Sequence, residues 1–199
     1  MRDLGLRGAE ICSKVNGADL DDKSLAPLYA KAEELDVPLF VHPSGVPELS
    51  QRLRPYYLIN LIDNPMDTTI AAASLIFGGV LNEFPRLKVY LAHGGGACPY
   101  IAGRWEHGWG VRDEGKAKID RPPSEYFRLL YFDSLVHDAA ALEFLVRKVG
   151  PERVMLGTDY PFEMGNYASV QAVEAIVGLT DDERELILGG NASRLFGPG

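Results

Sequence analysis

Short apolar runs alternate along this chain with segments of helical periodicity. Five runs are predicted to be strands, at residues 7–15, 37–43, 87–96, 128–136 and 153–162. Helices are predicted at residues 21–36, 66–84, 99–109 and 138–150, and a last one from Thr180. In the first of these, Leu25, Leu28, Ala32 and Leu35 recur at the spacing of one helical face. Nearly continuous apolar strands between helices predict an α/β fold with a parallel sheet.

The ends of the predicted helices carry their usual signals. Asp138 is the first residue of the helical segment at residues 138–150 and is expected to be its N-cap. We therefore assign Asp138 and the neighbouring His137 to a loop and N-cap. Gly150 before Pro151 ends that helix. Thr180 and Glu183 have the spacing of a capping box. Repeats, linkers and low-complexity segments do not occur, so one domain over residues 1–199 is predicted.

Composition and charge narrow the classes of partner. The chain is 46% hydrophobic and 24% charged, as in ordinary globular proteins. Its net charge of −8 argues against nucleic acid or an anionic membrane surface as the main partner. No stretch reaches the roughly 18 apolar residues of a membrane span. The two cysteines, Cys12 and Cys98, form no disulfide framework, so we expect a cytoplasmic protein in which both are small buried residues.

Polar residues stand at or near the ends of four of the five predicted strands. His42 ends the second strand, His93 the third and Asp159 the fifth, and Asp133 lies late in the fourth. The carboxyl ends of parallel strands are where α/β barrels gather their catalytic residues. Imidazole and carboxylate together suit zinc or a similar divalent metal. The joint pattern therefore predicts a metal site, although it assigns Asp133 no ligand role.

The stretch LAHGGG, residues 91–96, is compatible at first with several kinds of site. A dinucleotide fingerprint requires a third glycine where this chain has Pro99, and a phosphate-binding loop requires a Gly-Lys-Ser/Thr sequence that does not occur. An esterase strip requires a G-x-S-x-G elbow, which is also absent from the sequence. A catalytic histidine at the end of a barrel strand remains, with glycines that let the backbone pass close to a ligand.

Several longer stretches resemble the amidohydrolase superfamily. They lie in family order over nearly the whole chain and read PLFVHP, TTIAAASLIFGGVLNEFPRLKVYLAHGGG, GRWEHG, YFDSLVHD, LGTDYPFEMG and GNASRLF. The resemblance is to the amidohydrolase-related branch, which includes α-amino-β-carboxymuconate-ε-semialdehyde decarboxylases. It implies a TIM-barrel-type (β/α)₈ fold of metal-dependent enzymes.

The resemblance also implies roles for residues at matching positions. His42 and Asp159 correspond to metal ligands, with Zn²⁺ the expected ion, and His93 to the catalytic histidine beside the metal, where Asp159 also acts. Arg104 corresponds to an arginine that holds a substrate carboxylate and reaches the partner's site in dimers. A planar bidentate donor suits that task. Neighbouring Trp105 and His107 are expected on the same dimer-facing helix.

The sequence departs from the family in two places. Complete members begin with a strand ending in His-x-His, which supplies two more ligands, and no His-x-His occurs here. The five predicted strands would correspond to strands 4–8 of the barrel, so we interpret the chain as N-terminally truncated. The second departure is the segment HPSGVPE after His42, where the muconate-semialdehyde decarboxylases carry a tryptophan and an acidic residue. This segment is expected to face the site, so the exact substrate stays open.

The expected reaction is non-oxidative decarboxylation of an unsaturated or aromatic small-molecule carboxylate. Two alternatives remain: metal-dependent hydrolysis of an amide or lactone at the same centre, and a non-catalytic fragment. Because His42 and Asp159 are an incomplete ligand set, little or no activity is predicted for the isolated 199 residues. A homodimer, or association with a missing N-terminal part, is the expected assembly.

Overall fold

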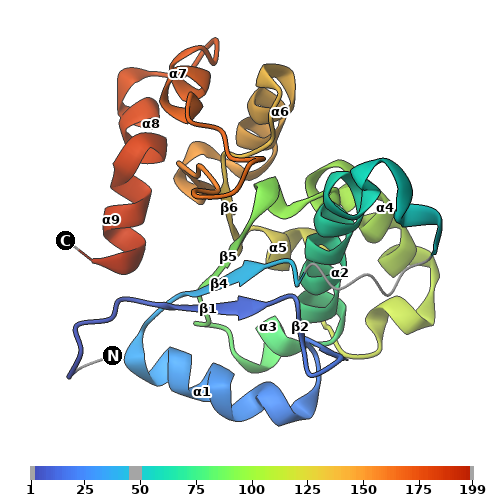
Figure 1. The fold of residues 1–199 in the computed structure, drawn as a ribbon. Helices are drawn as coiled ribbons and strands as arrows, with labels where there is room; N and C mark the ends of the chain where they lie inside the picture. Colours follow the sequence, from blue (N-terminus) through green and yellow to red (C-terminus); the bar gives the residue numbers. More distant parts are fainter. Residues whose placement is uncertain (1–2, 45–50, 198–199) are drawn as a thin grey trace.

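A parallel sheet forms the centre of the molecule. The computed structural model describes residues 3–44 and 51–197. Within them, five parallel strands stand in the order β1-β4-β5-β6-β7 (Figure 1). Their bounds are β1 (Ala9–Cys12), β4 (Leu39–His42), β5 (Val89–Leu91), β6 (Tyr131–Asp133) and β7 (Val154–Met155). A small antiparallel hairpin, β2 (Lys14–Val15) and β3 (Ala18–Asp19), follows β1. The predicted α/β fold with a parallel sheet is confirmed.

Helices occupy the connections between the strands. The α-helices are α1 (Ala26–Leu35), α2 (Asn64–Phe77), α3 (Val80–Glu83), α4 (Cys98–Val111), α5 (Pro123–Phe127), α6 (Ala139–Val149), α7 (Ser169–Glu174), α8 (Asp181–Glu185) and α9 (Asn191–Phe196). Short 3₁₀ turns are η1 (Lys23–Leu25), η2 (Gln51–Leu53), η3 (Pro55–Tyr57), η5 (His93–Gly95), η6 (Asp113–Lys116) and η7 (Pro151–Arg153). Two π-helical segments, η4 (Ile59–Asp63) and η8 (Leu186–Gly190), lead into α2 and α9. None of the described helices is long and apolar enough to cross a bilayer.

Several predicted boundaries hold and others move. The Thr180 capping box is formed, and Asp138 caps α6 by accepting from the Ala141 N–H at 2.8 Å. The helix predicted at residues 66–84 is instead broken into α2 and α3 at Gly79, whose φ of +82° is left-handed. A Cβ there would lie 2.8 Å from the Lys118 carbonyl oxygen, so glycine permits a close chain crossing.

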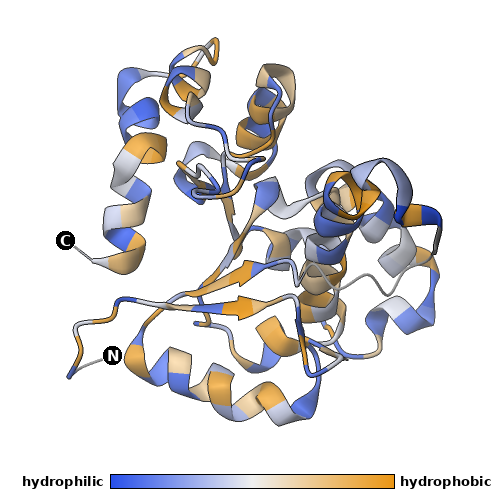
Figure 2. Ribbon diagram, viewed as in Figure 1, coloured by the Kyte–Doolittle hydropathy of each residue, from blue (hydrophilic) through white to orange (hydrophobic). Residues whose placement is uncertain are grey.

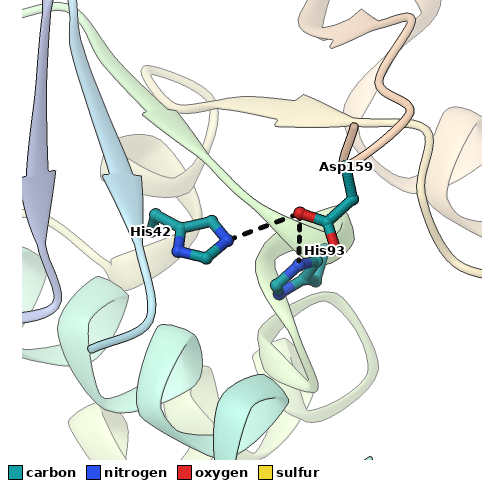
Figure 3. A group of neighbouring side chains, drawn as sticks. All are labelled: His42, His93 and Asp159. Carbon is teal, nitrogen blue, oxygen red and sulfur yellow. Dashed lines mark ion pairs between the residues drawn. The ribbon is translucent and has the colours of Figure 1, made fainter. Parts of the chain in front are cut away.

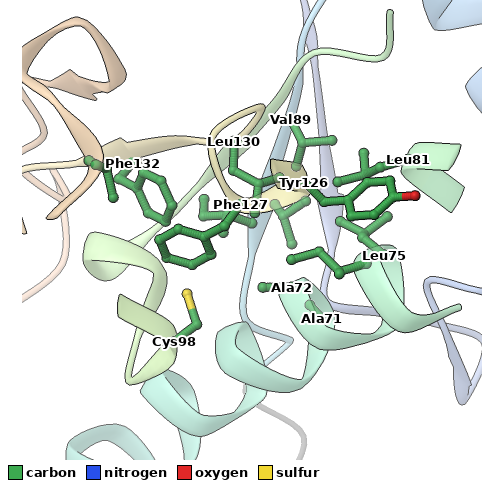
Figure 4. Close-up of a cluster of buried hydrophobic side chains, with 14 of the residues drawn as sticks. Ala71, Ala72, Leu75, Leu81, Val89, Cys98, Tyr126, Phe127, Leu130 and Phe132 are labelled. Carbon is green, nitrogen blue, oxygen red and sulfur yellow. The ribbon is translucent and has the colours of Figure 1, made fainter. Parts of the chain in front are cut away.

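Side chains from one face of the sheet and the helices form the main core. Leu39, Val41, Val89 and Leu91 alternate with less buried residues along β4 and β5, as expected for strands with one face covered by helices. Figure 4 shows part of this core, which includes both aliphatic and aromatic side chains. The rings of Phe127 and Phe132 lie 5.2 Å apart. Figure 2, coloured by hydropathy, shows apolar residues in the strands and hydrophilic residues in helix α8. Burial of these apolar side chains is the main stabilisation of the fold.

The two cysteines differ in their surroundings. Cys98, at the start of α4, is fully buried and belongs to the core, as predicted. Cys12, at the end of β1, is exposed, so the prediction that it is buried was wrong. The reason is its position: Glu10 and Cys12 are the exposed residues that alternate along β1, and β1 pairs with a single strand, β4, among the described residues. An apolar run alone does not tell which face of an edge strand is covered.

Candidate metal centre

Three of the predicted site residues converge at the carboxyl ends of the strands (Figure 3). His42 is the last residue of β4, His93 opens the 3₁₀ turn η5 after β5, and Asp159 follows β7. The Asp159 Oδ1 lies 3.5 Å from His42 Nε2 and 3.7 Å from His93 Nε2. Parallel strands place their carboxyl ends at one edge of the sheet, so residues far apart in sequence meet there. Potential ligand atoms of all three residues lie within 4.8 Å of one another.

The hydrogen bonding of His42 leaves one ring nitrogen directed at this cluster. His42 Nδ1 lies 3.1 Å from the Pro43 carbonyl oxygen. Because a carbonyl can only accept, this contact requires a proton on Nδ1, and in the neutral ring it leaves Nε2 available to bind a metal. Nε2 is buried and has no hydrogen-bond partner among residues 3–44 and 51–197. A bare imidazole nitrogen facing a carboxylate is the arrangement of a histidine metal ligand oriented by a backbone carbonyl.

Two opposing effects act on the pKa of His93. Burial lowers its pKa below the usual value for histidine, while the nearby Asp159 carboxylate acts in the opposite direction. Its Nδ1 is also buried and unpartnered in the described part of the chain. A neutral imidazole beside a carboxylate can accept a proton or bind a metal. Two imidazoles and one carboxylate are donors that suit a divalent metal, and His42 and Asp159 can bind it while the His93 ring lies beside it.

Both His93 and Asp159 adopt a backbone conformation that side chains rarely take. Their φ angles are +55° and +56°. Left-handed conformations in residues other than glycine cost energy and cluster at functional sites. After His93 the chain passes close to α2: a Cβ on Gly96 would lie 1.9 Å from the Pro65 carbonyl oxygen. This contact explains why glycine is needed there. The close approach is to α2, and the expected approach of the glycines to a ligand stays a prediction.

Asp133 stabilises the 3₁₀ turn η5, which begins at His93. Its Oδ2 accepts the His93 N–H at 2.9 Å, and its Oδ1 accepts the N–H groups of Gly94 at 2.7 Å and Leu135 at 3.1 Å. Both carboxylate oxygens of Asp133 thus accept hydrogen bonds from backbone amides, and Asp133 is not among the candidate metal ligands. The sequence showed that Asp133 lies near a strand end but indicated no role for it. Its hydrogen-bond partners are backbone amides, which no side-chain motif reveals.

A second buried carboxylate, Asp67 of α2, fixes the chain after His42. Its Oδ2 accepts the Ser44 N–H and the Ser44 hydroxyl, both at 3.1 Å, and also the hydroxyl of Ser13. These bonds tie the end of β4 and the residue after β1 to one helix. Sequence reasoning missed Asp67, although a charge within the apolar helix at residues 66–84 was a usable signal.

The candidate centre opens into a largely apolar cavity of about 490 Å³. His93 and Asp159 form part of its polar lining, and His137 contributes to its rim. The apolar wall comes from side chains after β6 and on α6: Leu135, Val136, Ala141, Phe144 and Leu145. Apolar walls with a few convergent polar groups are typical of small-molecule sites. His137 was assigned to a loop; it is in a loop, and that loop borders the cavity.

Arg104 lies elsewhere in this chain. It is exposed on α4 and lines a separate surface hollow with Trp105 and Trp109. Within a single chain it therefore does not meet His93, and its role at a partner's site stays a prediction. His107 is exposed on the same helix. The segment after Ser44, at residues 45–50, lies outside the described residues, so its expected position facing the site also stays a prediction.

Burial of Asp133 has a consequence for stability. It raises the pKa of this carboxyl to about 7, although the three amides act in the opposite direction. The unfolded chain has a pKa near 3.9 at this residue. The folded state therefore binds the proton more tightly, and the stabilisation from Asp133 is largest below about pH 4, falls as the pH rises towards about 7, and stays low above it.

The measurement is the free energy of unfolding from pH 4.5 to 8 for the wild type and Asp133→Asn. We expect the difference, wild type minus variant, to fall steadily up to about pH 7. Asp138→Asn, at an exposed cap, serves as the matched control and should show no such slope. A difference that rises with pH would mean that the three amides outweigh burial.

Comparisons with known proteins identify the family of this chain. The model of the amidohydrolase family, Amidohydro_2, matches residues 1–197. The chain belongs to the amidohydrolase family. This amidohydrolase chain is 43% identical over 196 residues to the 2-amino-3-carboxymuconate-6-semialdehyde decarboxylase of Dictyostelium discoideum, covering 98% of the chain and 54% of the relative. The resemblance predicted from the sequence is confirmed.

Solved structures agree with this assignment. The 5-carboxyvanillate decarboxylase of Sphingomonas paucimobilis superposes with a TM-score of 0.85 at 29% identity, covering 96% of this amidohydrolase chain and 58% of that one. The same enzyme from Novosphingobium aromaticivorans, solved as a variant with bound manganese, gives 0.86 at 25% identity, covering 98% and 58%. The expected barrel-type fold class is thereby confirmed. The chain spans little more than half the length of each of these proteins.

Proposed function

We propose that this chain carries the metal-binding and proton-transfer residues of a metal-dependent decarboxylase acting on an unsaturated or aromatic carboxylate. The observation that carries the proposal is the meeting of His42, His93 and Asp159, the last two of which line a largely apolar cavity. Similarity to proteins described as muconate-semialdehyde and carboxyvanillate decarboxylases supports this reaction class. The apolar wall suits a planar unsaturated substrate, and a metal held by the cluster would bind its carboxylate.

In this proposal His42 and Asp159 hold a divalent metal. Zn²⁺ matches the imidazole and carboxylate donors, and Mn²⁺, present in a similar structure, is the other candidate. When bound, the metal supplies positive charge that binds a carboxylate and stabilises negative charge developing on the substrate. The buried Nε2 of His42 supports this assignment, since a cation there would satisfy it.

His93 then handles the proton that the reaction requires. In a non-oxidative decarboxylation the bond to the carboxylate breaks, carbon dioxide leaves, and the electron pair stays on carbon, which takes up one proton. The lowered pKa of His93 keeps its ring neutral near pH 7, so the ring can accept a proton and pass it on to the carbon. Asp133 keeps the turn that bears this ring in position. The apolar wall keeps water away from the reacting carbon.

Arg104 is proposed to bind a substrate carboxylate in a second copy of the chain, which requires a homodimer. Its exposure on α4 supports this, because an exposed guanidinium is free to reach another molecule. The cytoplasmic location is likewise a proposal, based on the low cysteine content.

Hydrolysis of an amide or lactone is the second candidate function. The same donor set can activate a water molecule as readily as it binds a carboxylate, so the cluster by itself suits both reactions. The products separate the two reactions, since carbon dioxide is released only by decarboxylation.

The test incubates the chain, supplied with Zn²⁺ or Mn²⁺, with 5-carboxyvanillate and with a set of aryl lactones and amides. Because little or no activity is predicted for the isolated chain, the chain is used in excess over substrate, so that a slow single turnover can be detected. We expect carbon dioxide in equal amount to the decarboxylated product, and none after chelation of the metal. Hydrolysis products without carbon dioxide would contradict the proposal and favour the second candidate.

A further inference from the structure

Phe162 lies against the ring of a candidate metal ligand, although it is an exposed residue. It is 57% exposed, yet its ring is stacked on the His42 imidazole, with the ring centres 6.0 Å apart and the two planes inclined by 14°. Offset stacking at this separation is a favourable arrangement of two rings. In the described part of the chain, neither residue lines the candidate cavity, so the stack is not part of the cavity wall.

The loop after β7 places Phe162 there through backbone hydrogen bonds. The Phe162 N–H donates to the Asp159 carbonyl at 2.9 Å, and the Gly165 N–H donates to the Phe162 carbonyl, also at 2.9 Å. The Asn166 N–H closes the loop by donating to the Thr158 carbonyl at 2.9 Å. One short loop therefore carries both the Asp159 carboxylate and the ring that lies on the other candidate ligand, His42.

The other neighbours of the His42 ring meet it differently. Phe40 and His93 approach at 6.1 Å and 5.2 Å, with planes inclined by 51° and 67°. Both inclinations are far from parallel, so neither ring lies flat on the imidazole. The Nδ1 atom of His42 is 3.1 Å from the Pro43 carbonyl oxygen, which restrains one edge of the ring. The parallel contact with Phe162 restrains a face of it.

We propose that Phe162 is a positioning residue for the metal centre, because its ring keeps the His42 imidazole in the orientation that directs Nε2 at Asp159. This inference rests on the metal site of the proposed function and is independent of the reaction at that site. Rotation of the imidazole would turn Nε2 away from Asp159 Oδ1, which lies 3.5 Å from it. A flat ring against the imidazole opposes this rotation, since the turning edge would collide with it. Groups that orient a ligating histidine strengthen metal binding.

The experiment compares Phe162→Leu with Phe162→Tyr and Tyr167→Leu. Leucine keeps an apolar side chain but has no flat face, and tyrosine restores that face. Tyr167 is the matched control, because it is 66% exposed and its ring pairs with Tyr160 at 6.3 Å. Tyr167→Leu thus removes an exposed aromatic ring close to the same loop without changing the stack on His42.

The first readout is Zn²⁺ affinity, measured by competition with a chromophoric chelator. We expect Phe162→Leu to lower it about tenfold, and Phe162→Tyr and Tyr167→Leu to change it by less than about threefold. The second readout is the nitrogen-15 spectrum of the metal-free chain at about pH 8, where histidine side chains are ordinarily neutral. The His42 ring should be protonated on Nδ1 in the wild type and in Phe162→Tyr, and on either nitrogen in Phe162→Leu. Because the replaced rings are exposed, all metal-free forms should melt within about 2 °C of the wild type.

The outcomes separate this inference from the metal centre on which it rests. If His42→Ala loses Zn²⁺ affinity but Phe162→Leu keeps the wild-type affinity or the wild-type tautomer, the role of Phe162 is refuted and the metal centre stands. If Phe162→Leu melts far below the wild type, or Tyr167→Leu loses as much affinity, the rings support the fold of the loop and the positioning role is refuted. If His42→Ala binds Zn²⁺ as tightly as the wild type, the metal centre is refuted, and the role of Phe162 with it.

Discussion

Replacing His42 with alanine is expected to lower the affinity of the chain for Zn²⁺ by more than about a hundredfold. Loss of residues that only orient metal ligands already costs 10- to 100-fold, and His42 Nε2 is placed as a ligand itself, beside Asp159 Oδ1. Asp159→Asn should have a comparable effect, because it removes the negative charge of the cluster. The measurement is competition with a chromophoric chelator at constant pH.

His137→Ala is the control for this experiment. His137 borders the same cavity but is outside the cluster of candidate ligands. Its replacement should change Zn²⁺ affinity by less than about threefold. Equal affinities of wild type, His42→Ala and Asp159→Asn would show that the metal, if bound, lies elsewhere.

The second large effect is expected for His93→Gln. Loss of a positioned general acid–base typically costs about 10²- to 10⁴-fold in rate, so carbon dioxide release under enzyme excess should fall by that factor. Zn²⁺ affinity should change by less than about tenfold, because His42 and Asp159 remain. The exposed His107 on α4 supplies the control, His107→Gln, which should retain the wild-type rate.

The split between rate and affinity decides the role of His93. Its Nε2 is 3.7 Å from Asp159 Oδ1, close enough for a shared metal. If His93→Gln loses Zn²⁺ affinity as severely as His42→Ala, His93 is a third ligand and not the proton-transfer residue. If rate and affinity both stay at wild-type values, His93 has neither role.

The parts of the fold that follow from side-chain pattern could be predicted from the sequence. Apolar runs located all five parallel strands, and the positions of His42, His93 and Asp159 at strand ends were enough to expect them together. The parallel topology explains this success, since it brings every carboxyl end to one edge of the sheet whatever the lengths of the connections. Local caps, at Asp138 and Thr180, were equally accessible because they depend on three or four residues.

Features that depend on long-range contact could not be predicted in the same way. Apart from the Leu135 amide, the groups that donate to Asp133 and Asp67 lie 23 to 54 residues away along the chain. The exposure of Cys12 likewise depends on which strands lie beside β1. In each case the environment of the residue depends on which chain segments lie beside it, and the sequence pattern around the residue does not show this.

The most direct test of the metal centre is a crystal of the chain grown with Zn²⁺ and measured on both sides of the zinc absorption edge. We predict one anomalous peak between His42 and Asp159, about 2.0–2.2 Å from the His42 Nε2 and an Asp159 carboxylate oxygen, with His93 beside it. A crystal whose anomalous peaks all lie away from these side chains, at a zinc concentration that saturates binding in solution, would contradict the account.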